Sequence, residues 1–300
     1  MKSSIAVLVA FLSVIGLPAA PAAADALELR PRLQPGSTYP LSLRVDTRTE
    51  ASSSGEAGSS HAEDVRLHYR ASVTVIAVDG DGRPVRELHE GVSLTYERPD
   101  ETGSLFKPGA AFEVRREGAI EIHVGRDRLP PRAEKAVADV LAKQFEYTLE
   151  PALLAPARGV EVGDSWTPDA SLVRRYLLSR GVRVLELGEE ASATLRRASA
   201  DEGGDGLVIE YRIPIERFEL REMPRQVELG RTDAALTGWV QLAADAAAPP
   251  VAALSRLVLD LNGTSNASPR AHPWSLRSTE TVERRARPLD EMASAAGSPR

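Results

Sequence analysis

A Gly-Asp-Ser tripeptide at residues 163–165 comes nearest to a catalytic motif, because it surrounds the nucleophile in two classes of serine hydrolase. One class requires further glycines after the serine and an upstream cysteine-containing segment, but here Trp-Thr-Pro follows and the chain has no cysteine. The other requires a later Asp-x-x-His, whereas His272, the one histidine after Ser165, follows Pro-Arg-Ala. A serine without a base to take its proton is inert. We therefore predict a tight turn in which Asp164 caps the backbone and Trp166 anchors the core.

Histidines and carboxylates are the other residues that could do chemistry. The five histidines show no paired spacing of the kind that metal sites use, and His68 and His123 fall on the polar side of alternating strands. Glycosidase chemistry needs two carboxylates that face each other in a cleft, and the acidic pairs of this chain lie in predicted turns. We therefore predict no catalytic, cofactor-binding or metal-binding residue, and no cofactor. The histidines are His61, His68, His89, His123 and His272, and the acidic pairs are Asp100-Glu101, Glu189-Glu190 and Asp201-Glu202.

Residues 1–24 have the pattern of a cleaved export signal. Lys2 supplies a positive start, residues 5–17 are almost continuously apolar, and small residues lead to a cleavage position after about Ala24. A membrane anchor would need about 20 apolar residues, and this run is shorter. Without cysteine, lipoprotein processing has no residue to act on. The sequence thus predicts a periplasmic or secreted protein that is not a lipoprotein.

The composition of the chain disfavours some classes of binding partner. Removing residues 1–24 takes away Lys2 and moves the formal net charge from −6 to −7. This mild acidity disfavours a nucleic-acid partner, which calls for a clustered basic surface. An exported chain without disulfides must rely on a hydrophobic core, and no second apolar run is long enough to span a bilayer. We expect no nucleic-acid partner and no integral membrane segment after signal cleavage.

Most of the remaining chain alternates between apolar and polar residues, as strands of an antiparallel sheet do when one face is packed and the other is wet. Residues 65–75 form an unusually long example, and Asp79–Gly82 supplies the turn of a hairpin. Pro214 interrupts another run and indicates an edge or a bulge. Residues 50–63 lack an apolar pattern, which predicts a mobile hairpin loop.

One amphipathic helix is predicted over residues 131–146, where apolar side chains recur at helical spacing. Residues 171–179 are a weaker second candidate. Gly-Ser-Thr-Tyr at residues 36–39 and Gly-Asp-Ser-Trp at residues 163–166 open similar strands, so two related halves, 27–130 and 158–287, could flank the helix. We expect a single β-rich domain over residues 25–287, followed by a disordered tail at residues 288–300.

Three segments carry a resemblance to a family of exported bacterial β-rich proteins of unknown function. They are Leu-Arg-Pro-Arg-Leu-Gln-Pro-Gly at residues 29–36 with Tyr39, Val-Asp-Gly-Asp-Gly-Arg at residues 78–83, and Val-Glu-Val-Gly-Asp-Ser-Trp at residues 160–166. The resemblance covers most of the mature chain. It implies a β-rich protein of the cell envelope and transfers no active site.

The predicted fold class is mainly β, with a curved antiparallel sheet (a half-barrel or open barrel-like form) and one amphipathic helix. Such a sheet must cover its apolar face with the helix or with a ligand. The first hypothesis is an exported, non-enzymatic envelope protein that binds an apolar or lipid-like ligand in the sheet. The alternative is a structural or protein-interaction module that uses a sheet edge or the concave face. A serine hydrolase that uses Ser165 is the remote alternative.

Overall fold

The computed structural model describes residues 29, 32–54, 59–105, 107–116, 120–123, 129–143, 160–198, 206–221, 227–243, 248–265 and 271–286. The predicted export signal at residues 1–24 and the predicted tail at residues 288–300 lie outside these residues. Among the described residues, no helix has the length and apolar character needed to cross a bilayer.

Thirteen strands among the described residues join into one antiparallel sheet. Their order across the sheet is β6-β5-β3-β2-β1-β13-β12-β11-β10-β9-β7, and β4 and β8 add to β3 and β10. The strands are β1 (Thr38–Ser53), β2 (Ser59–Val78), β3 (Pro84–Arg98), β4 (Glu101–Ser104), β5 (Ala110–Arg115), β6 (Glu121–His123), β7 (Ser165–Trp166), β8 (Val182–Leu187), β9 (Ser192–Arg197), β10 (Leu207–Leu220), β11 (Val227–Leu242), β12 (Ala252–Ser265) and β13 (His272–Arg285).

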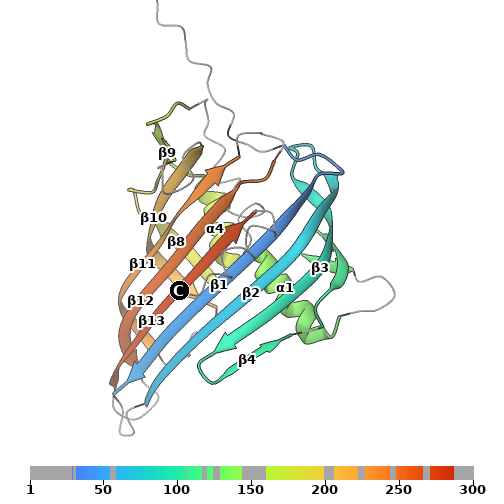
Figure 1. Cartoon of the computed structure of the whole chain (residues 1–300). Helices are drawn as coiled ribbons and strands as arrows, with labels where there is room; N and C mark the ends of the chain where they lie inside the picture. Colours follow the sequence, from blue (N-terminus) through green and yellow to red (C-terminus); the bar gives the residue numbers. More distant parts are fainter. Residues whose placement is uncertain are drawn as a thin grey trace, which may run out of the picture.

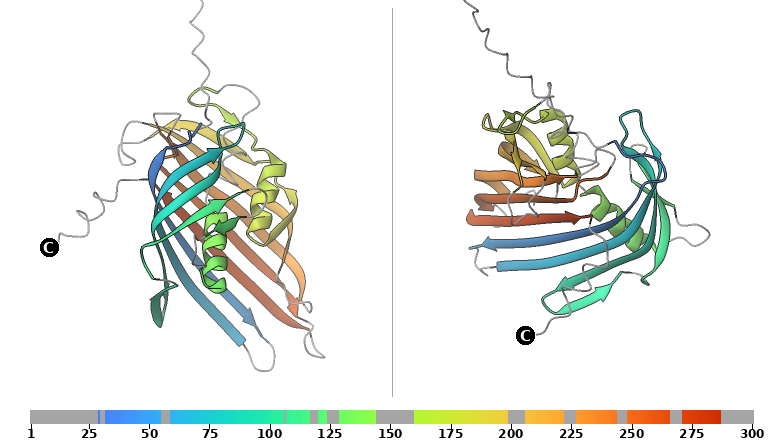
Figure 2. Two further views of the ribbon diagram at one scale, coloured as in Figure 1. Left: turned by 90° about the vertical axis from the view of Figure 1, so that its right-hand side faces the viewer. Right: turned by 45° about the horizontal axis from the view of Figure 1, so that its top comes forward.

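The sheet is strongly curved and open (Figure 2). Its path ends at β6 on one side and at β7 on the other, and no ladder joins these two strands in the described part of the chain. β1 and β13, the first and last strands in the chain, pair in the middle of the sheet. This pairing, from Ser42 with Arg285 to Ser53 with Trp274, is the seam between an N-terminal and a C-terminal wing.

Alternation along each strand sorts the side chains between a concave and a convex face. In β1, Leu41, Leu43 and Val45 are buried on the concave face. The intervening Arg44 and Asp46 form an ion pair on the convex face. The same parity runs across the paired strands, since Val45 lies opposite Leu67 of β2 and Val282 of β13. The concave face is therefore apolar and the convex face is charged.

Two helices pack on the concave face, one in each wing (Figure 2). α1 (Pro131–Ala142) buries Val137, Val140 and Leu141 against the strands of the N-terminal wing. α4 (Ala170–Ser179) buries Val173, Tyr176 and Leu177 against the C-terminal wing. Asp169 caps α4 by accepting hydrogen bonds from the backbone N–H groups of residues 171 and 172. Each wing thus has its own hydrophobic cluster and its own helix.

This architecture confirms the predicted fold class, a curved antiparallel sheet with an amphipathic helix. The helix is present over Pro131–Ala142, residues 144–146 lie outside the described residues, and the second candidate is present as α4. Pro214 lies where the pairing of β10 passes from β9 to β8, next to a register shift, as the expected edge or bulge requires. A relation of residues 27–130 to residues 158–287 by duplication stays a prediction.

The mobile loop predicted at residues 50–63 is wrong over most of its length. β1 continues to Ser53 and β2 begins at Ser59, while residues 55–58 lie outside the described residues. The strands persist without an apolar pattern because β1 is paired on both sides along this stretch, with β2 and with β13. Cross-strand bonds such as Ser52 Oγ to Ser275 Oγ, 2.7 Å, add to the ladders.

Gly238 offers a test of the close packing inside the C-terminal wing. A Cβ at this position would lie 2.0 Å from the carbonyl oxygen of Leu254 and 2.5 Å from the hydroxyl of Tyr211. We expect Gly238→Ala to lower the free energy of unfolding by about 1–3 kcal/mol, as overpacking does. Gly80→Ala, where a Cβ meets nothing within 4 Å, should change it by less than about 0.5 kcal/mol. Urea denaturation of both variants checks this, and equal stabilities would contradict the packing described.

Candidate functional site

A largely buried carboxylate on the seam, whose side chain is 14% exposed, holds the ends of both helices. Glu280 of β13 lies on the concave face opposite Leu257. Its Oε2 accepts from the ammonium of Lys143, the residue that caps the C-terminus of α1. Its Oε1 accepts from Nε of Arg180, 2.6 Å away, and Arg180 is the C-cap of α4. One carboxylate therefore ties together a strand at the seam and a helix from each wing.

Hydroxyl groups extend this seam cluster into the C-terminal wing. The guanidinium of Arg180 donates to the Tyr176 hydroxyl, 2.7 Å, and to Ser255 Oγ, 3.2 Å. The Tyr211 hydroxyl donates to the carbonyl of Leu254, 3.1 Å. Burial raises the pKa of Tyr211, so this phenol stays protonated and remains a donor.

Charges in the seam cluster stay ionised despite their burial. Burial alone would raise the pKa of the Glu280 carboxyl, but attraction to Arg180 and Lys143 outweighs it and leaves the pKa below its ordinary value. Burial would likewise lower the pKa of Arg180, but attraction to Tyr176 and Glu280 leaves it raised. The Arg180 side chain is 1 % exposed, so it depends on Glu280 for compensation of its charge.

A second buried polar network lies under α1 in the N-terminal wing. Glu87 and His89 of β3 are both fully buried. Glu87 accepts from the Tyr39 hydroxyl, 2.8 Å, and from the Arg116 guanidinium, 3.1 Å. The Tyr69 hydroxyl lies 2.7 Å from Nδ1 of His89, and the imidazole stacks on Phe112. Since Glu87 and His89 have no exposed surface, they join strands β1, β2 and β3 and do not face a solvent-accessible pocket.

Burial lowers the pKa of His89, against opposing hydrogen-bonding and attraction from Glu87. It also raises the pKa of Tyr69 well above its ordinary value. His89 is therefore neutral near pH 7, and the protonated Tyr69 hydroxyl donates to Nδ1. The arrangement has the residue types of a proton relay, but its burial assigns it to the packing of the wing.

Ser165 directly follows the tight turn that the sequence predicts and is the first residue of β7. Gly163 has a positive φ of 101°, and Asp164 Oδ2 accepts from the backbone N–H of Glu161, 3.0 Å. The Ser165 hydroxyl bonds to Thr194 Oγ1, 2.7 Å. His272 is on β13, and four strands separate β13 from β7. The structure therefore does not bring this histidine to Ser165.

Where the structure describes them, the histidines and carboxylates do not assemble into a metal site. No group of three or more His, Asp or Glu side chains with suitable geometry occurs in the described ranges. His68 lies on the convex face and contacts Ser42, 3.1 Å, and His123 contacts Glu121, 3.1 Å. Glu189, Glu190 and Asp100 are exposed in turns, as predicted, whereas the exposed Glu101 begins β4, and Asp201-Glu202 lies outside the described residues.

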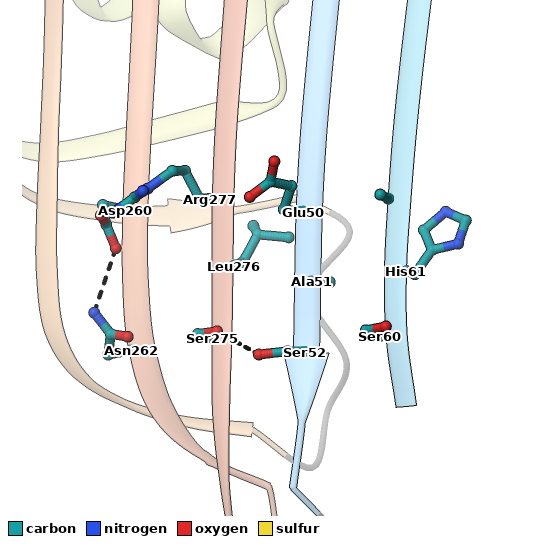
Figure 3. A pocket seen from close by; sticks show the side chains of 11 residues that line it. Glu50, Ala51, Ser52, Ser60, His61, Asp260, Asn262, Ser275, Leu276 and Arg277 are labelled. Carbon is teal, nitrogen blue, oxygen red and sulfur yellow. Dashed lines mark hydrogen bonds and ion pairs between the residues drawn. The ribbon is translucent and has the colours of Figure 1, made fainter. Parts of the chain in front are cut away.

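Hollows lined by described residues occur on the convex face. One, of about 410 Å³, lies across β12, β13, β1 and β2 (Figure 3). Its polar groups satisfy each other, since Arg277 pairs with Asp260, 2.7 Å, and Ser52 bonds to Ser275. A second, of about 400 Å³, contains Arg66, which pairs with Asp46 and Glu97. A third, of about 490 Å³, lies over Gly238 between β9 and β12.

An apolar surface continues on the concave face beyond the helices. The strands next to the seam run past both α1 and α4 (Figures 1 and 2). In this part Leu261 is buried, while Leu229, Trp274 and Leu276 are half-buried and pack against the C-terminal cluster. Leu276 lies opposite Leu261 on one side and Ala51 on the other. We call Leu229, Leu261, Trp274 and Leu276 the distal patch.

Comparisons with known proteins do not place the chain in a family. No family model matches it, and no curated protein matches it. Among solved structures, lipovitellin, described for its lipid–protein interactions, has a TM-score of 0.43 and 8% identity over 85% of this chain. The chain spans only 25% of that lipovitellin chain. DynF from the dynemicin biosynthesis pathway of Micromonospora chersina has a TM-score of 0.19 and 11% identity, covering 90% of this chain and 91% of DynF. Scores this low carry no argument about function.

The two buried networks were missed by reasoning from the sequence. Val92 and Leu94 are apolar and two residues apart. If their alternation continued toward the start of β3, Leu88 would lie on the concave face and His89 on the convex face. Gly91, with a φ of 62°, lies at a register shift that reverses this parity. The glycine after Glu90 was the one available signal. No local sequence signal indicates that Glu280 is the centre of a buried network, because its two partners lie 137 and 100 residues away in the chain.

Removing the charge of Glu280 should destabilise the protein strongly. Glu280→Gln leaves Arg180 buried without its counter-charge, so we expect the free energy of unfolding to fall by about 3–5 kcal/mol. Glu283→Gln on the same strand removes a carboxylate that pairs with Arg285 on the convex face, and it should cost less than about 1 kcal/mol. Urea denaturation followed by circular dichroism compares the two. Similar losses would refute the anchoring role of Glu280.

The buried imidazole predicts a pH dependence of stability. The unfolded chain binds a proton at His89 near pH 6.5, but the folded chain binds it only at lower pH because the folded pKa is lowered. Its contribution to stability is therefore full above pH 6.5 and is lost as the pH falls through the folded pKa, by at most about 1.4 kcal/mol per pH unit. Glu87, Tyr69 and Arg116 are the titratable groups around it.

His89→Gln, which keeps a donor and an acceptor, should flatten the decline in stability between pH 7 and pH 5.5. The matched control is His123→Gln, because His123 is exposed, and this variant should retain the decline of the unaltered protein. Urea titrations at several pH values measure both slopes. An unchanged slope in His89→Gln would show that another group causes the decline.

Proposed function

We propose that this chain is a non-enzymatic binding protein that holds an apolar or lipid-like ligand on the concave face of its curved sheet. The observation that carries the proposal is the distal patch, an apolar surface that continues the C-terminal cluster past the ends of the covering helices. Trp274 and Leu276 are half-buried there. When a ligand removes the exposed part of such half-buried apolar side chains from water, the free energy falls.

The shape of the sheet supports binding on the concave face. The strands on both sides of the patch bend toward the same interior (Figure 2), so a ligand on Leu276 would contact several strands at once. Thr49 and Ser278 lie next to the patch on the same face, with their hydroxyl groups 3.2 Å apart. They offer hydrogen bonds to a polar head, while the patch would take an apolar chain.

Docking of a partner through a sheet edge has less support. The edge strands β6 and β7 have three and two residues, and β4 has four. Short edge strands are one means by which sheets avoid pairing with other chains. A partner protein on the concave face would use the same apolar patch, so the ligand experiment also separates these alternatives.

We also propose where in the cell the protein acts. The pattern of residues 1–24 supports export, with cleavage after about Ala24, and the protein would then act in the bacterial cell envelope, in the periplasm or after secretion. A carrier in such a compartment would need a core that holds without disulfides, and each wing has a buried cluster of this kind.

A titration with N-phenyl-1-naphthylamine, whose emission rises in apolar surroundings, tests the binding surface. We expect saturable binding to the unaltered protein. Leu276→Glu places a carboxylate in the patch and should weaken binding tenfold or more, because burial of a leucine contributes about 1.5–3 kcal/mol.

The control is Leu185→Glu, which makes the same change at a leucine that is 42% exposed on β8. It should leave the affinity within twofold of the unaltered protein, and circular dichroism should show both variants folded. Absence of saturable binding, or equal binding by the two variants, would overturn the proposal. Binding that disappears when a co-purified protein is removed would favour the protein-interaction alternative.

A further inference from the structure

The convex hollow over Gly238 contains two arginines, whereas most other arginines of this face pair with a carboxylate. Elsewhere on the convex face, Arg44, Arg48 and Arg285 each pair with an acid two residues away on the same strand. Arg66 and Arg277 pair with acids on neighbouring strands. Most guanidinium groups of this face are thus neutralised by nearby carboxylates, and Arg70, which donates to His68, is a further exception.

Arg212 of β10 and Arg256 of β12 are exposed, and neither has an acidic partner within the described parts of the chain. The carboxylate nearest in sequence to Arg212 is Glu210, which instead pairs with Arg196, 2.8 Å away. Arg256 lies opposite a threonine on each side, Thr237 and Thr281. The hollow therefore carries positive charge on a protein whose net charge is negative.

The sheet aims both guanidinium groups at the same place. Arg212 and Arg256 are both paired with Thr237, from opposite sides. Neighbouring strands lie about 4.8 Å apart, so the two Cα atoms are separated by about 10 Å. An arginine side chain is long enough to span half of this distance, so a carboxylate or phosphate oxygen above Thr237 would be within reach of two charged donors.

The remaining lining adds a flat apolar surface and hydroxyl groups. Trp239 is half-buried on the convex face and lies opposite Glu210 and Leu254. Gly238 contributes backbone to the floor of the hollow, between Thr237 and Trp239. Ser192 and Thr194 of β9 line the far side. An indole face accepts the C–H face of a sugar ring, and hydroxyl groups match its polar edge.

We propose that this hollow binds an acidic sugar unit of a glycan, with its anionic group between Arg212 and Arg256 and its ring against Trp239. An isolated pair of arginines suits a single negative charge, whereas nucleic acid calls for a broad basic surface. The other two convex hollows lack this property because their arginines are paired. The site is on the face opposite the distal patch, so it does not depend on the proposed apolar ligand.

Isothermal titration with trigalacturonic acid tests the proposal, with maltotriose as the neutral sugar and acetate as the anion without a ring. We expect saturable, salt-sensitive binding of trigalacturonic acid and at least tenfold weaker binding of the other two. The double variant Arg212→Gln, Arg256→Gln should bind at least tenfold more weakly. Arg277→Gln, which removes the same charge from a paired arginine of the same face, should stay within twofold.

The role of the ring is tested separately by Trp239→Ala and Trp239→Phe. The alanine variant should lose most of the affinity for trigalacturonic acid, and the phenylalanine variant should keep most of it. Retained binding in the phenylalanine variant would show that substitution at this position does not simply unfold the protein. The proposal is overturned if the unaltered protein does not bind trigalacturonic acid, if maltotriose or acetate binds equally well, or if Arg277→Gln weakens binding as much as the double variant does.

Discussion

The fold depends on one largely buried carboxylate, Glu280, because an open sheet with an apolar concave face must hold its covering elements in place. α1 and α4 have twelve and ten residues, and helices of this length are marginal on their own in water. Each ends in a basic residue, Lys143 or Arg180, that binds Glu280. Positive charge at a helix C-terminus is also favoured by the helix dipole. The seam strand β13 thereby fixes where both helices stop.

Where the helices stop determines which part of the concave face is left for other contacts. Beyond the seam cluster the face changes from buried residues such as Val282 to the half-buried Leu276 and Trp274. On the opposite face, charge pairs between neighbouring residues replace apolar packing, and Arg212 and Arg256 interrupt that pattern. The concave face of the sheet is therefore apolar and the convex face is charged. The alternation of apolar and polar residues along each strand produces both faces.

Much of this fold was predictable because its information is local. Alternation predicted the antiparallel sheet, helical spacing predicted α1, and the Gly-Asp-Ser segment was correctly interpreted as a turn. Two kinds of feature could not be predicted from the sequence: which face of the sheet some residues occupy, and which contacts form between residues far apart in the chain. A glycine bulge at Gly91 inverted the facing of Glu87 and His89, and pairing on both sides extended β1 through the polar residues 50–53. The distal patch could not be located either, because it requires knowing which strands flank β13.

In the proposed function, the concave face beyond the helices carries an apolar ligand. Native mass spectrometry of the protein purified without detergent from the cells that make it tests this most directly, together with organic extraction of the same sample. We expect a species heavier than the bare mature chain by one lipid-like molecule, which dissociates on extraction and is absent from a Leu276→Glu variant purified in the same way. A chain found only at its bare mass, with no extractable apolar compound in stoichiometric amount, would contradict it.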